Sequence, residues 1–316
     1  MMFASRNHPR RGRLYCQRVG SFDGLNLVWK ILRALSSGII SFSTEVAVMK
    51  YFADDTTKPV ILQRGLKKIL EIGASFGSNT KMLLSIEGIK LTIIDPCLDL
   101  DLAAEFGERV TVRQGLSLDV LPTLIEQFDC IFVDGDHNWY TVFNELSLIE
   151  QKGLLQPDGV IFLHDVSWPY GRRDMYYQPS TVPSKYHQPF AMKGIERGRS
   201  KLVDSGGFNE GHLNAIEEGG PLNGVLTAIE DFVQQSEHEY YLIVDDRQWG
   251  LAILFRKSAS GADQLNRMLR SQIFRRRHIE PKIRAWNDLV TKAKNSPPAT
   301  MLRKCRDLLL GRKTPR

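Results

Sequence analysis

A short apolar run that breaks into glycine and serine, residues 69–80 (ILEIGASFGSNT), places the strongest constraint on how this chain folds. Ile69, Leu70 and Ile72 predict a buried strand, and helical sequence resumes near Asn79. A strand, a turn of small residues and a helix, in this order, predict the first βα unit of a nucleotide-binding sheet. Glycines in such a turn let the backbone approach a ligand where a Cβ atom would collide.

The acid within this strand narrows the class of ligand. Glu71 stands two residues before Gly73, where a carboxylate would repel a pyrophosphate and attract a cationic amino group. S-Adenosylmethionine carries an ammonium group and no phosphate. The order of acid and glycine therefore favours S-adenosylmethionine over a dinucleotide.

The rest of the chain alternates strands with helices. Strands are predicted at 68–73, 91–95, 109–114, 130–134 and 159–165, with a terminal hairpin at 240–244 and 251–255. Helices are predicted at 79–86, 117–127, 138–151 and 222–235, with two more within 24–53, and a turn at 156–159. This pattern predicts an α/β, doubly wound Rossmann-like sheet of seven strands, mostly parallel, with a C-terminal antiparallel hairpin.

Composition divides the chain into three parts. Residues 1–60 form an N-terminal extension with helices, and residues 61–258 form the α/β domain, with an insertion at 166–221. The insertion is rich in Gly, Pro, Tyr and Arg, and it is too long for an idle connection. Residues 259–316 read as a basic helical tail with a break at Pro297-Pro298.

Charge is segregated along the chain. The net charge is +6, but residues 1–22 carry +5, residues 264–316 carry +12 and residues 23–263 carry −11. An acidic body argues against a nucleic-acid-binding core, while the basic ends suit an anionic membrane, RNA or plain solvation. Four scattered cysteines without metal spacing indicate a reducing compartment, so we expect a cytoplasmic protein.

The N-terminal extension leaves two readings open. Its arginines, without any acid before residue 23, resemble a transit peptide, while Met49 offers a later start after an unstructured extension. Lys30 and Arg33 interrupt the apolar stretch 25–49, which falls short of the ~20 apolar residues of a membrane span. We therefore expect neither a transmembrane segment nor a secretory signal in this stretch.

Four motifs in fixed order carry a family resemblance. EIGASFG (71–77), IIDP (93–96), FVDGDHNW (132–139) and LLQPDGVIFLHDV (154–166) resemble class I S-adenosylmethionine-dependent methyltransferases. Within that superfamily the chain is similar to macrocin-type sugar O-methyltransferases and cephalosporin-hydroxylase-like proteins. The resemblance covers roughly residues 60–257 and implies O-methylation of a hydroxyl on a small-molecule, sugar or glycoside acceptor.

The resemblance assigns the cofactor contacts. Glu71 would hold the methionyl ammonium, Asp95 would accept from the ribose hydroxyls, and Leu116 and Ser117 would edge the adenine. Asp95 lies 24 residues after Glu71, close to the ~20-residue spacing of the ribose-binding acid in dinucleotide folds. The expected cofactor-binding residues are Glu71, Gly73, Ser75, Gly77, Asp95, Leu116, Ser117 and Asp136.

A second group of side chains ends the fourth and fifth strands. By resemblance Asp134 and Asp165 would bind a divalent cation. The chain departs from the family pattern at the third ligand, because His164 precedes Asp165 and Val166 follows it, where relatives place a carboxylate or an Asn. His164 is therefore either a further ligand or a hydrogen-bonded residue near the pocket. Oxygen ligands suit Mg²⁺, whereas an imidazole favours Mn²⁺ or iron. His164 and Asp165 can share one metal only if the strand has ended between them, because adjacent strand residues face opposite ways.

His137 is the expected catalytic base. It lies three residues after Asp134, where related sugar O-methyltransferases keep a catalytic histidine, and an ordinary imidazole pKa suits proton transfer at cellular pH. The competing interpretation is an N-terminal helix residue packed on Trp139. In the insertion, Trp168, Arg173 and the pair Tyr176-Tyr177 suit a sugar, aromatic or acidic acceptor, and His212–Asn223 suits a lid.

Other functional classes fare less well. A short-chain dehydrogenase needs a Tyr-x-x-x-Lys pair, which none of the nine tyrosines provides, and Asn79 replaces the last glycine of its loop. A 2-His-1-carboxylate iron site is not evident. A methyltransferase fold retained as a binding module without activity stays open, as does a homo-oligomer, and no specific nucleic-acid partner is expected.

Overall fold

The computed structural model describes residues 48–98 and 105–294. The chain divides into two compact units, the first ending at Ala262 and the second beginning at Asp263, and each is described by itself. The extension before residue 48, most of the two helices predicted within 24–53, and the break predicted at Pro297-Pro298 lie outside the described residues.

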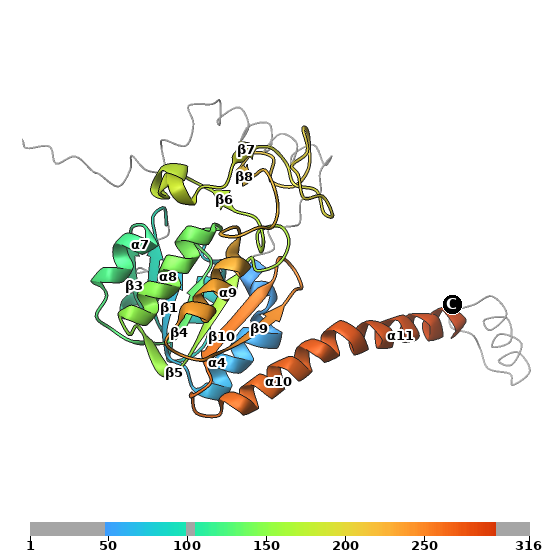
Figure 1. Ribbon diagram of the computed structural model, residues 1–316. Helices are drawn as coiled ribbons and strands as arrows, with labels where there is room; N and C mark the ends of the chain where they lie inside the picture. The colour runs from blue at the N-terminus through green and yellow to red at the C-terminus, as the bar shows by residue number, and fades with distance from the viewer. Residues whose placement is uncertain (1–47, 99–104, 295–316) are drawn as a thin grey trace, which may run out of the picture. The chain divides into compact units, whose positions relative to one another are not determined.

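The first unit is built on a seven-stranded mixed sheet in the order β3-β2-β1-β4-β5-β10-β9 (Figure 1). Its parallel strands are β1 (Lys68–Ile72), β2 (Lys90–Asp95), β3 (Val110–Gln114), β4 (Phe128–Val133) and β5 (Leu155–His164). β10 (Leu251–Arg256) runs antiparallel to both β5 and β9 (Tyr240–Asp245). The predicted doubly wound Rossmann-like fold with a C-terminal antiparallel hairpin is therefore confirmed.

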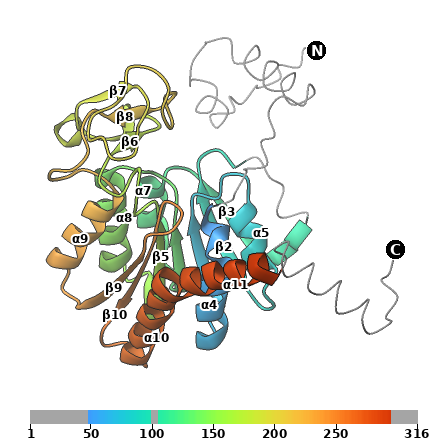
Figure 2. The same ribbon diagram turned by 90° about the vertical axis from the view of Figure 1, so that its right-hand side faces the viewer.

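Helices cover both faces of this sheet. Figure 2 shows α8 (Trp139–Gln151) and α9 (Val225–Gln235) on one face, and α4 (Lys58–Arg64) and α5 (Ser78–Leu84) on the other. The central strands are apolar and buried along nearly their whole length because neither face reaches solvent. Strand order reverses between β1 and β4, so the carboxyl ends of these two strands border the crevice where ligands bind in such sheets.

Two predicted elements differ from the structure. The helix predicted at 117–127 is only α7 (Ser117–Val120) followed by a 3₁₀ turn (Leu121–Thr123), because Pro122 cannot continue the helical hydrogen bonding. β5 begins at Leu155 and not at 159. The predicted turn at 156–159 falls in a register shift, since β4 advances from Phe128 to Cys130 while β5 advances from Leu155 to Val160.

The insertion after β5 is a structured unit and not an irregular loop. It carries a small antiparallel sheet of β6 (Met175–Tyr176), β8 (Leu213–Ala215) and β7 (Phe190–Met192) (Figure 1). Arg173 and Asp174 are fully buried at its base. The Arg173 guanidinium donates to the backbone carbonyls of Ala215 and Ser200, which joins distant parts of the insertion.

A short N-terminal segment precedes the sheet. It comprises α3 (Val48–Tyr51), a π-helical turn η1 (Ala53–Thr57) and α4. Phe52 is fully buried, and its ring meets His164 at 6.3 Å in an edge contact. This segment is therefore part of the α/β core and reaches the end of β5.

The second unit is helical. It contains α10 (Ala262–Phe274), a π-helical turn η6 (Arg275–Ile279) and α11 (Glu280–Lys294). Leu265, Leu269 and Ile273 of α10 are buried, whereas most apolar side chains of α11 are exposed. Residues 262–294 are thus helical in the part of the tail that the structure describes.

Substituting Gly73 by alanine tests the close approach of β1 and β4. A Cβ at Gly73 would lie 2.3 Å from the carbonyl oxygen of Asp134 and 2.4 Å from the Cα of Gly135, and the residue has a φ of +82°. We expect Gly73→Ala to lower the free energy of unfolding by more than about 3 kcal/mol, because backbone atoms must move apart. Chemical denaturation measures this change.

Gly153 provides the matched control. Its φ is +61°, and a Cβ there would meet nothing within 4 Å. Gly153→Ala should therefore cost only about 1–2 kcal/mol for the left-handed conformation. Equal losses in the two variants would show that the contact between β1 and β4 contributes nothing beyond the backbone angle.

Candidate active site

The site begins where β1, β2 and β4 end side by side. The Gly73 amide donates to the Ile94 carbonyl at 2.9 Å, and the Asp134 amide donates to the Ile72 carbonyl at 2.9 Å. The space beside Gly73 is filled by the β4 backbone. We predicted that this glycine lets a ligand approach the backbone. In the structure, the space that a Cβ would occupy is filled by the chain just after β4, so the missing side chain lets the ends of β1 and β4 pack together.

Glu71 is buried beneath the turn. Its carboxylate accepts from the Asn79 amide at 2.9 Å and from the Thr80 hydroxyl at 2.6 Å, both on α5. Burial raises the pKa of Glu71 to about 7, against the lowering effect of these two donors. Glu71 therefore lies at the balance point between its charged and neutral forms near neutral pH, with only 1% of its surface exposed.

Asp95 organises the glycine turn. One oxygen of its carboxylate accepts from the backbone amides of Ala74 and Ser75 at 2.9 and 3.0 Å, and the other accepts from Cys97 at 2.8 Å. Ser75 adopts a left-handed φ of +47°, and Gly77 has a φ of +72° before α5. The sequence analysis did not anticipate that Asp95 shapes this turn, and its contact with a ribose stays a prediction.

Asp136 has partners within its own loop. It accepts from the His137 backbone amide at 2.9 Å, from the Asn138 side chain at 2.7 Å and from the Thr141 hydroxyl at 2.8 Å. Asn138 in turn caps α8 by accepting from the Thr141 amide. Burial raises the pKa of Asp136 above its ordinary value. Its contact with a cofactor stays a prediction, while its function in ordering the start of α8 is visible.

The predicted adenine edge adjoins an acid that the sequence analysis did not single out. Leu116 and Ser117 open α7, and Glu145 of α8 is fully buried, with neither carboxylate oxygen hydrogen-bonded among the described residues. Burial raises the pKa of Glu145 to about 8, against the opposing effect of the Ser117 side chain. Glu145 follows Val142 by three residues and precedes Ile149 by four, which places it on the buried face of α8. This spacing was the signal that could have found it.

Two acids and two histidines meet at the ends of β4 and β5. His137 Nε2 lies 2.6 Å from Asp165 Oδ2 and 3.9 Å from Asp134 Oδ1. His164 Nδ1 lies 3.2 Å from Asp134 Oδ1 and 3.1 Å from Asp165 Oδ2. The structure thus brings together the four residues that the sequence assigned to the base and the metal site.

The backbone of Asp165 makes this convergence geometrically feasible. β5 ends at His164, and Asp165 has a left-handed φ of +57°, which turns its side chain out of the strand alternation. Asp is one of the few residues other than Gly that adopt this conformation readily. The condition under which His164 and Asp165 can share one partner is therefore met.

The cluster carries its own charge compensation. Burial lowers the pKa of His164, but the carboxylates of Asp134 and Asp165 outweigh it and raise that pKa to about 10. The pKa of His137 is also raised, with Asp165 overcoming the effect of burial. Burial would raise the pKa of Asp165, yet both histidines hold it far below its usual range. Two imidazolium groups can thus neutralise two carboxylates without a metal.

The same residues also fit a divalent cation. One ligand atom each from Asp134, His164 and Asp165 lie within 4.8 Å of one another, which allows a single ion to touch all three. His164 Nε2 and His137 Nδ1 are buried without a hydrogen-bond partner among the described residues. Two carboxylates and an imidazole favour Mn²⁺ or iron over Mg²⁺.

Aromatic rings surround the cluster on two sides. His137 lies 5.4 Å from the Tyr170 ring and 5.6 Å from the Tyr177 ring, both from the insertion. His164 lies 6.4 Å from Trp249, in the turn between β9 and β10. Trp249 was missed from the sequence because the hairpin carries no motif that points to β5.

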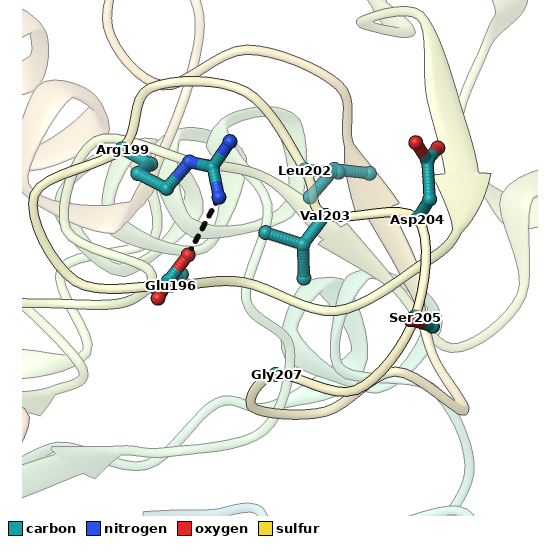
Figure 3. A pocket seen from close by; sticks show the side chains of 7 residues that line it. All are labelled: Glu196, Arg199, Leu202, Val203, Asp204, Ser205 and Gly207. Atoms are coloured by element: carbon teal, nitrogen blue, oxygen red, sulfur yellow. Dashed lines mark hydrogen bonds and ion pairs between the residues drawn. The ribbon is translucent and has the colours of Figure 1, made fainter.

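The insertion also forms a hollow of its own, of about 390 Å³ (Figure 3). It is lined by Glu196, Arg199, Leu202, Val203, Asp204, Ser205 and Gly207. An ion pair of 2.9 Å between Arg199 and Glu196 lies along it. None of the candidate site residues lines it, so it is separate from the strand-end cluster.

One part of the chain matches a known protein family. Residues 70–166 match the model of a family described as a methyltransferase domain. This stretch runs from within β1 to the second residue after β5 and contains every residue expected to bind the cofactor or a metal or to act as the base. Residues 70–166 are therefore similar to a methyltransferase domain.

Solved structures with the same architecture include enzymes of several kinds. The 1,6-didemethyltoxoflavin-N1-methyltransferase of Burkholderia thailandensis, solved with S-adenosylhomocysteine, is 16% identical over 81% of this chain and 93% of its own, with a TM-score of 0.41. A Podospora anserina methyltransferase with the same ligand is 17% identical over 81% of this chain and 100% of its own, with a TM-score of 0.40. The search of curated proteins found no match.

The O-methyltransferase TomG of Streptomyces achromogenes, in complex with S-adenosylmethionine, is also similar. It is 17% identical over 77% of this chain and 94% of its own, with a TM-score of 0.39. The structures found thus include both N- and O-methyltransferases.

Replacing Glu71 by glutamine should change how stability depends on pH. A folded pKa of about 7 against an ordinary value of 4.5 means that the folded state holds a proton which the unfolded state releases. The wild type should therefore lose about 3 kcal/mol of this contribution as pH rises from about 4.5 to about 7. Glu71→Gln has no charge to bury, so its stability relative to wild type should rise over that range.

Urea denaturation at several pH values measures this difference. The loss of one acceptor for Asn79 or Thr80 lowers the stability of Glu71→Gln by an amount that does not depend on pH. A difference between the two proteins that stays constant from acidic to neutral pH would contradict the raised pKa.

Proposed function

We propose that the protein transfers the methyl group of S-adenosylmethionine to a hydroxyl of a small-molecule acceptor. The observation that carries this proposal is the pairing of His137 with Asp165 at 2.6 Å. This pair lies at the carboxyl ends of the parallel strands, as do Glu71 of β1 and Asp95 of β2. A histidine held by a buried carboxylate beside a nucleotide crevice is equipped to take a proton from an attacking hydroxyl.

Glu71 and Asp95 would bind the cofactor. The Glu71 carboxylate would pair with the methionyl ammonium, and this pairing would favour its charged form over the neutral one. Asp95 would accept from the ribose hydroxyls while it keeps the turn at Ala74 and Ser75 in shape. When bound, S-adenosylmethionine supplies an electrophilic methyl group on a sulfonium.

His137 would act on the acceptor. Asp165 fixes the imidazole through Nε2, so Nδ1, which has no partner among the described residues, is the nitrogen assigned to the acceptor hydroxyl. The acceptor oxygen forms the new bond to the methyl carbon, the carbon–sulfur bond breaks, and the hydroxyl proton passes to His137. Asp165 stabilises the imidazolium that results.

Asp134, His164 and Asp165 would hold a divalent cation, with Mn²⁺ or Mg²⁺ as the ions to test first. A bound cation would lower the pKa of the acceptor hydroxyl and orient it. Proton transfer to a neutral His137 does not require the cation, because Asp165 stabilises the imidazolium that forms.

Tyr177 suggests the shape of the acceptor. Its side chain is 54% exposed although its ring lies 5.6 Å from His137 and 6.2 Å from His212. An exposed aromatic face beside the base suits a flat acceptor such as a sugar ring or a phenol. This agrees with the resemblance to sugar O-methyltransferases.

Binding of S-adenosylhomocysteine should be linked to proton release. Because the pKa of Glu71 is raised to about 7, ligation of the ammonium should expel a proton and affinity should rise between about pH 6 and pH 8. Calorimetry in two buffers of different ionisation enthalpy measures the proton directly. Glu71→Gln should bind roughly tenfold more weakly, and without the pH dependence.

A matched variant at a distant glutamate controls for the removal of a carboxylate as such. Glu126 lies near solvent at the end of the sheet remote from the turn and pairs with Lys68, so Glu126→Gln should leave the proton release unchanged. Tight binding by wild type with no proton release would show that Glu71 does not receive the ammonium. No binding at all would favour a methyltransferase fold that no longer uses the cofactor.

The chemistry is tested by His137→Gln. We expect methyl transfer to fall by a factor of about 10²–10⁴, while affinity for S-adenosylhomocysteine changes little because its contacts lie at β1 and β2. A labelled methyl donor with a panel of phenols and glycosides provides the assay. His238→Gln is the control, since His238 is exposed between α9 and β9.

The metal is tested separately in the same assay. Asp134→Asn should have a lower turnover than wild type. EDTA should lower the turnover of wild type, and adding Mn²⁺ or Mg²⁺ should restore it. Full activity in EDTA would remove the cation from the proposal and leave the base. Full activity of His137→Gln would remove the base.

A further inference from the structure

The last described helix carries an exposed apolar stripe. On and just before α11, Ile279, Ile283, Trp286 and Leu289 are 42%, 50%, 66% and 62% exposed. Ile279, Ile283, Trp286 and Val290 recur at intervals of four, three and four residues, which places them on one helical face. Side chains of this kind rarely stay in water unless another surface covers them.

Positive charge surrounds the stripe. Residues 275–294 contain seven Lys and Arg residues and two acids, a net charge of +5. The basic residues are Arg275, Arg276, Arg277, Lys282, Arg284, Lys292 and Lys294. By sequence, residues 295–316 add a further +5 directly after the helix.

We propose that η6 and α11 bind the surface of an anionic lipid bilayer. The apolar stripe would enter the boundary between headgroups and acyl chains, with Trp286 at that boundary and the cations facing lipid phosphates. Among the described residues no helix is long and apolar enough to cross a membrane, so the helix would lie in the plane of the surface.

The charge distribution favours this occupant over two others. A second copy joined through the same face would bring +5 against +5, which opposes association. A nucleic acid would attract the cations but would leave exposed Ile283 and Trp286 without any purpose. Of these three occupants, an anionic bilayer with an apolar layer beneath its headgroups is the one that satisfies both the stripe and the charge.

The test uses the full chain and vesicles, without cofactor, so its result does not depend on the proposed methyl transfer. The protein should sediment with vesicles of phosphatidylcholine mixed with phosphatidylserine, and not with phosphatidylcholine alone. Raising the salt from about 0.1 M to about 1 M should release it, because screening shortens the reach of the lysines and arginines.

Paired substitutions separate the stripe from the charge. Ile283→Gln with Trp286→Gln should weaken binding at least about tenfold, whereas Asn287→Gln with Thr291→Gln, off the apolar stripe, should stay within about twofold of wild type. Asp288→Asn removes an acid and should tighten binding by up to about fivefold. Circular dichroism checks that all variants keep the same helix content.

Three outcomes would overturn the proposal. One is that the full chain fails to bind the mixed vesicles, as it would if α11 covered a surface of the acidic body. Another is that Ile283→Gln with Trp286→Gln binds as tightly as wild type, which would assign binding to another basic segment. The last is that the protein forms a concentration-dependent dimer, that the same double substitution makes this dimer dissociate, and that vesicles have no effect on the dimer.

Discussion

The carboxylate of Asp174 joins the α/β core to the insertion beside the candidate active site. It accepts from the backbone amides of Trp139 and Gly224 at 2.8 and 2.6 Å, and from the Tyr176 hydroxyl at 2.8 Å. Three elements therefore share one buried group: the start of α8, the start of α9 and the insertion. Burial raises its pKa to about 6, yet the three donors stabilise the charged form. The insertion is thus joined to the loop that carries the base, and Met175 donates to the carbonyl of His137 itself.

The strand ends of this sheet place several acids in a space of low polarity, and each is compensated in its own way. Glu71 receives side-chain donors from α5, and Asp95 receives backbone amides from the turn. Asp165 receives two histidines. Glu145 has no hydrogen-bond partner among the described residues, and its raised pKa means that it is mostly protonated at neutral pH. The site is therefore preorganised, and a ligand competes with bonds that already exist.

Most of the sheet could be predicted from sequence because buried parallel strands are apolar along their whole length and their helices follow at regular intervals. The positions of Asp134, His137 and Asp165 followed from the same rule, since strand ends converge. What could not be predicted depends on distant parts of the chain. The left-handed turn at Asp165 has no local signature, and the extension of β5 to Leu155 depends on its pairing with Phe128. The hydrogen bonds of Asp95 to the turn could not be predicted, because the acid had already been assigned to the ribose and its sequence position does not show which backbone amides it accepts from.

The aromatic side chains that contact His164 have a consequence for the order in which the site is enclosed during synthesis. Phe52 lies on one side of the ring and Trp249 on another, so neighbours of a single side chain come from positions almost two hundred residues apart. A ribosome that has released the chain only as far as β5 has already supplied both acids and both histidines. The cluster stays open to water until the last hairpin arrives, and β10 then closes beside β5. The two acids and two histidines of the cluster would thus be synthesised early and enclosed late, when the Trp249 turn is in place.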